Sequence, residues 1–266
     1  VWMARGDLMD KYGIESLDTF EDVEAYLQAI VDNEPSMIPL DVGSDYDRQF
    51  VFDLMWNVET NSRGDDRYAV LPPSNMITCV CESDPEAKVM STLDTDIFLD
   101  VLNHVKDWKD RGFWSKNAVV NTQNNTESFQ AGKSALAVMN INTAKSLYAT
   151  LQAEHPEWDV QVFDAMNGAP ATIQSYLANG MSIFSKSKNP ERALMALDYL
   201  RNDQICNDLF CYGIEGVHWE AVGDHGLKSL PDSTNYAYDS NCNWGVRNDA
   251  TWRTVEGGIP NQDELV

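Results

Sequence analysis

The chain has 266 residues, with 42 Asp plus Glu against 19 Lys plus Arg, which gives a formal net charge of −23. A surface of this charge repels nucleic-acid backbones and anionic membranes, so we expect neither as a partner. Because 43% of the residues are apolar and 10% are aromatic, the composition excludes a disordered acidic tail and predicts one large folded domain or two smaller ones.

The ends of the chain and its cysteines say little about location. No apolar run approaches the ~18 residues that a membrane-spanning helix needs, and the first ten residues lack the pattern of a secretion signal. The chain opens at Val1, which we interpret as a processed chain or an excised domain. An odd number of cysteines cannot all pair within one chain, so we expect ordinary thiols at Cys79, Cys81, Cys206, Cys211 and Cys242.

Apolar periodicity predicts a series of helices in the first part of the chain. Residues 17–31 form an amphipathic pattern that Asp18 can cap. Residues 47–58 are apolar at helical spacing, and residues 95–111 predict a further helix that ends at Gly112.

Helices and strands alternate further along. A short helix over 126–131 leads into a strand over 134–139, and Asn142 or Thr143 caps the next helix. Residues 158–162 alternate as a strand does. The alternation predicts an α/β fold.

The last third has two clear helix starts and then loses its periodicity. Asn189 followed by Pro190 is typical of a helix N-terminus, and Asp203 starts a second helix that ends at Gly213. From Ile214 onwards the sequence is rich in Gly, Asn, Asp and Trp and predicts no regular element.

Metal and catalytic motifs are weak. His218 and His225 lie near two acidic residues, but a polar loop explains them without a metal. Asp94-Thr95-Asp96 stands at a helix start, where carboxylates cap free N–H groups. No nucleophile elbow, phosphate loop or dinucleotide fingerprint is present. We therefore expect no metal, no cofactor and no catalytic residue.

Aromatic residues point instead to a binding protein. Trp114, Trp219 and Trp244 lie in polar segments, where a flat ring beside amide and carboxylate groups suits the apolar face and the hydroxyl rim of a sugar. The alternative is that each ring anchors its own loop on the core.

Several segments resemble the carbohydrate-binding group of extracellular solute-binding proteins of bacterial ATP-binding-cassette importers, in a lipoprotein subgroup. The segments are RGDLMDKYGI (5–14) with DTFEDV (18–23), FQAGKSAL (129–136), SKNPERA (187–193), YGIEGVHW (212–219) and NWGVRN (243–248). They occur in the family's order and cover nearly the whole chain.

The resemblance implies a periplasmic-binding-protein-like type II fold, present as a fragment that lacks most of the first lobe. Residues 1–175 would be the main part of the second, C-terminal lobe, and residues 176–213 would return to the first lobe. Residues 214–266 would be a tail that crosses back to the second lobe. A chain with half a cleft is expected to bind sugar weakly or not at all.

The resemblance also implies a function. The chain would be the monomeric substrate-binding component of an importer and not an enzyme. It would capture a sugar or oligosaccharide between its lobes and deliver it to the membrane permease subunits. In the full-length protein it would be lipid-anchored on the extracellular face of the membrane, or periplasmic. Two alternatives stay open at this point, a glycoside hydrolase with a carboxylate pair in an aromatic-lined cleft and a peptide-binding protein on the same fold.

Ligand contacts are predicted at six positions. Relatives place an aromatic residue a few positions beyond the strand at 134–139, whereas this chain has Asn140 and Asn142, which can hydrogen-bond sugar hydroxyls. The other predicted contacts are Trp56, Trp114, Trp219 and Trp244.

Overall fold

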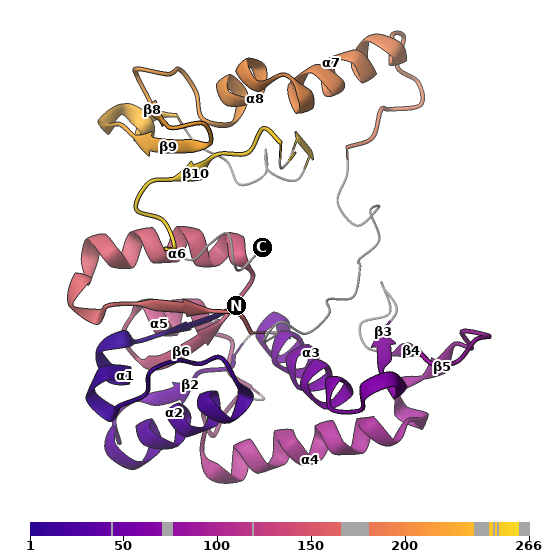
Figure 1. Ribbon diagram of the computed structural model, residues 1–266, viewed down its shortest axis with the longest axis vertical. Helices are drawn as coiled ribbons and strands as arrows, with labels where there is room; N and C mark the ends of the chain where they lie inside the picture. Colours follow the sequence, from indigo (N-terminus) through magenta and orange to yellow (C-terminus); the bar gives the residue numbers. More distant parts are fainter. Residues whose placement is uncertain are drawn as a thin grey trace. The chain divides into compact units, whose positions relative to one another are not determined.

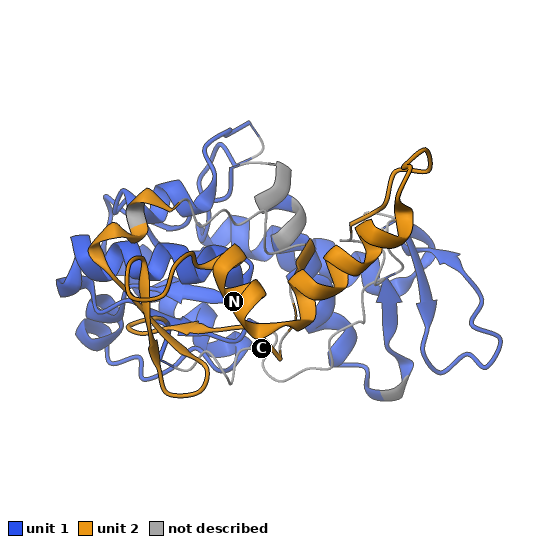
Figure 2. Cartoon of the chain, turned by 90° about the horizontal axis from the view of Figure 1, so that it is seen from above, with its two compact units in different colours: residues 1–173, 259–266 blue, residues 174–258 orange. Residues whose placement is uncertain are grey.

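The computed structural model describes residues 1–43, 45–70, 77–118, 120–165, 181–236, 245–246, 248 and 250–260. The chain divides into two compact units (Figure 2). Unit 1 contains residues 1–173 and 259–266, and unit 2 contains residues 174–258.

A mixed four-stranded sheet forms the centre of unit 1 (Figure 1). Its strand order is β2-β6-β1-β7, with β2 parallel to β6 and with β1 antiparallel to both of its neighbours. Trp2 on β1 lies opposite Val138 on β6 and Phe163 on β7. Helices cover the sheet, which confirms the predicted α/β class.

The elements of unit 1 alternate along the chain. Its strands are β1 (Trp2–Ala4), β2 (Ile38–Leu40), β3 (Tyr68–Val70), β4 (Thr78–Cys81), β5 (Met90–Ser91), β6 (Ser134–Val138) and β7 (Gln161–Phe163). Its α-helices are α1 (Gly6–Tyr12), α2 (Phe20–Asn33), α3 (Asp45–Asn61), α4 (Asp96–Arg111), α5 (Asn125–Gln130) and α6 (Ile141–Glu154). Strands β3, β4 and β5 form a separate antiparallel sheet.

Local capping explains where the helices begin and end. The helix predicted over 17–31 has its N-cap at Thr19 and not at Asp18, because Thr19 and Asp22 form the capping box. Helix α4 confirms its prediction closely, since Thr95 stands at its N-cap and Gly112 ends it in the left-handed conformation.

Two predictions around α6 are wrong in detail. The N-cap of α6 is Asn140, whose side chain accepts a hydrogen bond from the Thr143 amide at 3.0 Å, so neither Asn142 nor Thr143 caps this helix. Trp158 belongs to a 3-10 turn that starts at Pro156, and β7 begins only at Gln161. The proline stops the preceding helix and delays the strand.

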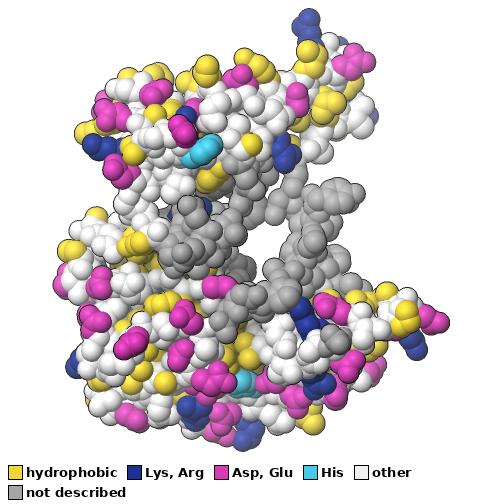
Figure 3. All heavy atoms as spheres, viewed as in Figure 1, with side chains coloured by type: hydrophobic (Ala, Val, Ile, Leu, Met, Phe, Trp, Pro, Cys, Tyr) yellow, Lys and Arg dark blue, Asp and Glu magenta, His cyan; other side chains and the backbone are white. Residues whose placement is uncertain are grey.

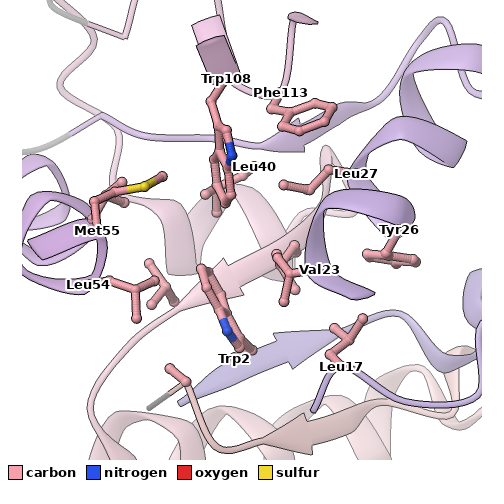
Figure 4. Close-up of a cluster of buried hydrophobic side chains, with 14 of the residues drawn as sticks. Trp2, Leu17, Val23, Tyr26, Leu27, Leu40, Leu54, Met55, Trp108 and Phe113 are labelled. Carbon is pink, nitrogen blue, oxygen red and sulfur yellow. The ribbon is translucent and has the colours of Figure 1, made fainter. Parts of the chain in front are cut away.

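Large apolar side chains fill the space between the sheet and its helices. Figure 4 shows this core, in which Trp2 from the sheet, Tyr26 and Leu27 from α2, and Trp108 from α4 are 2% exposed or less. A second cluster lies around Met3, Phe129 and other side chains. Burial of this kind contributes about 25 cal/mol per Å² of apolar surface removed from water, so this core dominates the stability of unit 1.

A histidine joins the three helices around this core. His104 on α4 contacts Glu59 on α3 through Nδ1 at 2.7 Å and Glu24 on α2 through Nε2 at 3.1 Å. Glu24 also accepts hydrogen bonds from Trp108 at 2.6 Å and from Arg111 at 2.7 Å. Burial alone would raise the pKa of Glu24, but the hydrogen bonds from Arg111, Trp108 and His104 outweigh it and lower the pKa.

Unit 2 is a helix pair with a small sheet. Its elements are α7 (Pro190–Asn202), α8 (Gln204–Cys211), β8 (Trp219–Val222), β9 (Gly226–Ser229) and β10 (Thr254–Val255), in the strand order β10-β9-β8. Pro190 at the first helical position and Asp203 at the α8 N-cap confirm the two predicted helix starts. The β8–β9 hairpin lies in the region where the sequence predicts no regular element.

Contacts within unit 2 tie the end of the chain to its helices. Arg253 makes two hydrogen bonds of 2.8 Å to the carboxylate of Asp208 on α8, and both side chains are only 10% exposed. Gln204 donates to the carbonyl of Thr251 at 3.0 Å. These contacts hold Thr251 and Arg253 against α8, and the chain rejoins unit 1 at Ile259.

One face of the helix pair is apolar and open. Figure 3 shows apolar side chains at the surface over α7 and α8. Among them, Leu194, Met195 and Tyr199 on α7 are each more than 60% exposed, and Ile205 on α8 is 80% exposed. No residue of α7 is buried. Within the described part of the chain, no helix is both long enough and apolar enough to cross a bilayer.

Candidate functional site

Three strand ends meet at one edge of the main sheet. Since β1 is antiparallel to both β6 and β7, and β2 is parallel to β6, the strands β2, β6 and β7 all point in the same direction. Their carboxyl ends therefore lie at a common edge, where β1 begins at Trp2. Ligands of open α/β sheets bind outside the carboxyl ends of the strands, so this edge is the candidate site.

The loop after β2 is held firmly at this edge. The buried carboxylate of Asp41 accepts hydrogen bonds from Asn121 at 3.0 Å and from Ser128 at 2.6 Å. Two residues on, a Cβ atom added to Gly43 would lie 1.6 Å from the carbonyl oxygen of Gln123. Only glycine permits this approach, so Gly43 fixes how closely the two loops pack.

A pocket of about 300 Å³ opens beside the end of β7 and the start of β1. Its walls come from the segment before α2, the last turns of α3, the start of β1 and the residues after β7. The lining side chains include Trp2, Phe20, Asp18, Glu21, Asn57, Asn61, Ser62 and Asp164. The described lining combines aromatic surface, amides, a hydroxyl and three carboxylates, and it contains no Lys or Arg.

One helix face presents the polar groups of α3 in this region. Asp53, Asn57 and Asn61 are spaced four residues apart and therefore follow one another along the same side of α3. The buried Oδ1 atoms of Asp53 and Asn61 have no hydrogen-bond partner among the described residues. Burial raises the pKa of Asp53 to about 6. Unsatisfied buried acceptors are costly, and of these two side chains only Asn61 also lines the pocket.

Three of the predicted contacts lie at the carboxyl edge but outside this pocket. Asn140 is the second residue after β6, and Asn142 lies in the first turn of α6 with its side chain partly exposed. Trp114 pairs with Leu40 at the outer side of β2, and its half-buried ring lies 5.6 Å from that of Trp108. The structure thus brings Trp114, Asn140 and Asn142 to one edge, on different strands of the sheet.

The other three predicted contacts are placed differently. Trp56 is 1% exposed, and its indole donates to the carbonyl of Tyr68 at 3.1 Å. Trp219, in unit 2, is 2% exposed and donates to the carbonyl of Gly213 at 3.1 Å. Both rings pack in the cores of their units, which disfavours ligand contact. Trp244 lies outside the described residues.

The cysteines and histidines considered for metal binding or reactivity make ordinary contacts with their neighbours. Cys79 is buried, and burial raises the pKa of its thiol to about 11, whereas Cys81 on the other face lies 3.1 Å from the Ser83 hydroxyl. His218 accepts a hydrogen bond from the Ile214 amide at 2.8 Å. Over the described residues, no three His, Cys, Asp or Glu side chains are grouped so that they could hold a metal ion.

The pocket residues were missed by sequence reasoning, although each carries a signal. Asp164 comes directly after β7, in the position from which strand-end ligands are contacted. Asn57 and Asn61 are amides at four-residue spacing on an otherwise apolar helix pattern. These signals mark a polar edge, but only the fold shows that the two segments face a common pocket.

Comparisons with known proteins agree with this architecture. No model of a known protein family and no curated protein matches the sequence. Solved structures do match, and three of them are carbohydrate-binding proteins. The N-glycan transport solute-binding protein of Streptococcus pneumoniae is 16% identical with a TM-score of 0.66, and the match covers 99% of this chain and 54% of that chain. The chain therefore has part of a type II periplasmic-binding-protein-like fold.

Two further structures share this fold. The alginate-binding protein AlgQ2 is 12% identical with a TM-score of 0.56, over 95% of this chain and 52% of that chain. A solute-binding protein from Bifidobacterium longum infantis, described as HMO-binding and ABC-transporter-associated, is 15% identical with a TM-score of 0.56, over 96% and 54%. The resemblance seen in the sequence motifs is confirmed at the level of the fold, and the chain spans about half the length of these structures.

Proposed function

We propose that this chain is part of the substrate-binding component of an ABC importer, and that unit 1 contacts an uncharged oligosaccharide at the carboxyl edge of its main sheet. The observation that carries the proposal is the polar pocket at that edge, with its orphaned Asn61 oxygen, on a fold shared with carbohydrate-binding proteins. The protein would bind and release its ligand without chemical change.

The chemistry of the lining selects the class of ligand. A sugar offers hydroxyl groups that both donate and accept, which suits the amides of Asn57 and Asn61 and the carboxylate of Asp164. Phe20, which is partly exposed, supplies apolar surface for the C–H face of a sugar ring. Three carboxylates with no described cation beside them would repel an acidic sugar. A neutral sugar or an amino sugar fits this pocket better than a uronic acid.

A longer ligand would extend along the sheet edge. Asn140 and Asn142 lie at the end of β6, next to β1, and Trp114 lies beyond β2. An oligosaccharide that runs along the edge from the pocket would meet the two asparagines first and Trp114 last. Asn142 and Trp114 are therefore proposed as additional contacts, and Asn140 as a contact that also caps α6.

The lobe assignment is part of the proposal. Unit 1 would be the main part of the second lobe, and residues 176–213 would belong to the first. The open apolar faces of α7 and α8 support this, because an amphipathic helix with no buried residue needs a further layer to cover it. The whole protein would close over its ligand, since contacts with both lobes favour the closed form that a permease recognises.

The location and partners follow from the same proposal. An importer component of this kind would be monomeric, would work outside the cytoplasmic membrane, periplasmic or held there by a lipid anchor, and would dock on the membrane permease subunits. The net charge of −23 supports solubility outside the cell, and it disfavours binding to anionic surfaces.

A ligand screen tests the function. Thermal-shift measurements would compare neutral oligosaccharides (Man1GlcNAc, Man5GlcNAc and human milk oligosaccharides), alginate oligosaccharides and peptides. We expect the neutral sugars alone to raise the melting temperature, and Asn61→Ala to abolish this effect while Asn33→Ala, on the exposed end of α2, preserves it. Stabilisation by peptides only would contradict the proposal.

Chromogenic glycosides test the enzymatic alternative in the same samples. Three carboxylates line the pocket, and hydrolysis needs two of them flanking the bond. We expect no turnover. Turnover that disappears in Asp164→Asn would show a glycoside hydrolase and overturn the proposal.

A further inference from the structure

A second cavity of unit 1 has the opposite chemistry to the first. A groove of about 420 Å³ runs between the first half of α3 and the second half of α4, which pack against each other, and reaches the loop after Trp114. Its floor is apolar and consists of Val42, Val51, Phe52, Leu102, Val105 and Trp114. Leu102 is 42% exposed, so the floor is open to solvent.

The rim of the groove is basic. Lys106 and Lys109 stand on successive turns of α4, and Lys116 lies across from them in the loop. Asp110 is the acid nearest to these lysines, at 2.6 Å from Lys106 and 3.5 Å from Lys109. Lys116 is exposed and has no ion-pair partner among the described residues. Lys106 and Lys109 thus share the carboxylate of Asp110.

A fourth cation keeps the groove in shape. The Arg48 guanidinium donates to the carbonyl of Ala118 at 2.8 Å and to the carbonyl of Gly43, and it therefore ties the N-terminal part of α3 to the two loops at the sheet edge. Arg48 itself lines the wall of the groove.

This basic groove stands out against the composition of the chain. Acidic residues outnumber basic ones by 42 to 19, yet the described lining of the groove contains four cations and no Asp or Glu. An apolar floor with a basic rim complements a ligand that is apolar on one side and acidic on the other. Because the groove follows two packed helices and is open along its length, an elongated ligand fits it better than a compact molecule.

We propose that the α3–α4 groove docks an acidic amphipathic helix of a partner protein. Its apolar side chains would lie on Leu102, Val105 and Trp114, and its carboxylates would meet Lys109 and Lys116. The groove and the sugar pocket share no lining residue, and Trp114 alone belongs both to the groove and to the proposed path of a longer sugar.

A designed peptide tests the proposal on the full chain. The probe is a fluorescein-labelled peptide of about 18 residues, with Leu at helical i, i+3, i+4, i+7 spacing and Glu elsewhere, and binding is measured by fluorescence anisotropy at low salt. We expect this acidic peptide to bind, although the chain as a whole carries −23, and the matching Leu-Lys peptide to bind more weakly. The affinity should fall as salt is added.

Charge reversal supplies the matched control. The double variant Lys109→Glu with Lys116→Glu should lower the affinity for the acidic peptide about tenfold or more. Lys88→Glu with Lys133→Glu makes the same change in net charge away from the groove and should leave the affinity unchanged. Leu102→Gln should also weaken binding of the acidic peptide. Saturation of the pocket with a neutral monosaccharide such as mannose, which is too short to extend from the pocket to Trp114, should leave binding of the peptide unchanged.

Three outcomes would overturn the proposal: equal binding by the groove variant and the control, preference for the basic peptide, or equal binding of a scrambled acidic peptide without an apolar face. Displacement of the peptide by dodecanoate at low concentration, with the peptide itself bound no better than the scrambled one, would show a small amphiphile site instead.

Discussion

Replacing Asp53 by Asn should stabilise unit 1 at neutral pH. The pKa of Asp53 is raised from 3.8 to about 6 by burial, and its Oδ1 has no hydrogen-bond partner among the described residues. A folded-state pKa above the unfolded value means that ionisation costs stability as the pH rises through this range. At about 1.4 kcal/mol per pH unit the difference corresponds to about 3 kcal/mol, which solvent screening of this partly exposed side chain reduces to about 1–2 kcal/mol.

Urea unfolding of the chain and of Asp53→Asn at several pH values measures this effect. The variant should be more stable by about 1–2 kcal/mol at pH 7.5, and the difference should shrink as the pH falls from 6 to 4, where the wild-type carboxyl is protonated in the folded state. Asp32→Asn, on α2, is the matched control and should show no such pH dependence. A difference that stays constant from pH 4 to 7.5, or a destabilised variant at pH 7.5, would refute the reasoning.

Three further substitutions test other parts of the structure. Glu24→Gln should destabilise the chain by about 1–2 kcal/mol at pH 7 and by less below pH 4.5. The reason is that the lowered pKa of Glu24 contributes stability that is lost as its carboxylate protonates, and urea unfolding at both pH values measures this loss. Gly43→Ala should cost about 3 kcal/mol or more in thermal unfolding, because the new Cβ would overlap the carbonyl of Gln123. Arg253→Ala should lower the stability of unit 2 by about 3 kcal/mol, because it leaves the buried Asp208 without its ion-pair partner. Hydrogen exchange should become faster in α8 and β9 and stay unchanged in unit 1.

Each of these has an outcome that contradicts it. A Glu24→Gln effect that is as large at pH 3.5 as at pH 7 would rule out the charged hydrogen bonds as its cause. Gly13→Ala is the control for Gly43, since no atom lies within 4 Å of its added Cβ and only about 1 kcal/mol of backbone strain is expected, so equal costs would contradict the steric account. Faster exchange in the main sheet of Arg253→Ala would show that the pair does not act within unit 2 alone.

The elements that local chemistry defines could be predicted from the sequence. Gly112 ends α4 because glycine adopts the left-handed conformation there, and Pro190 starts α7 because its missing N–H has no partner at a first helical position. The strand over Ser134–Val138 is apolar from its second residue onwards because it is buried on both faces. These signals lie within a few residues of the element that they specify.

The candidate site could be predicted only in part, because it depends on contacts between distant segments. Asn140 looked like a ligand contact next to a helix cap, and it is itself the cap. The sequence predicts Trp56 as a ligand contact, yet its ring packs in the core of unit 1. The pocket brings Asp164 next to Asn57 across more than a hundred residues of chain, and no local pattern indicates that pairing.

Side-chain NMR titration with Man1GlcNAc tests the central claim most directly. The indole N–H signals of the tryptophans and the amide signals of Asn57, Asn61 and Asn142 report separately on the pocket, on the sheet edge and on the rest of the molecule. Because the described lining of the pocket comes from unit 1 alone, we expect a Kd in the millimolar range, about −4 kcal/mol, with shifts at the pocket asparagines and at Asn142 and none at Trp219. Shifts confined to unit 2, or none at any concentration of the sugar, would contradict the account.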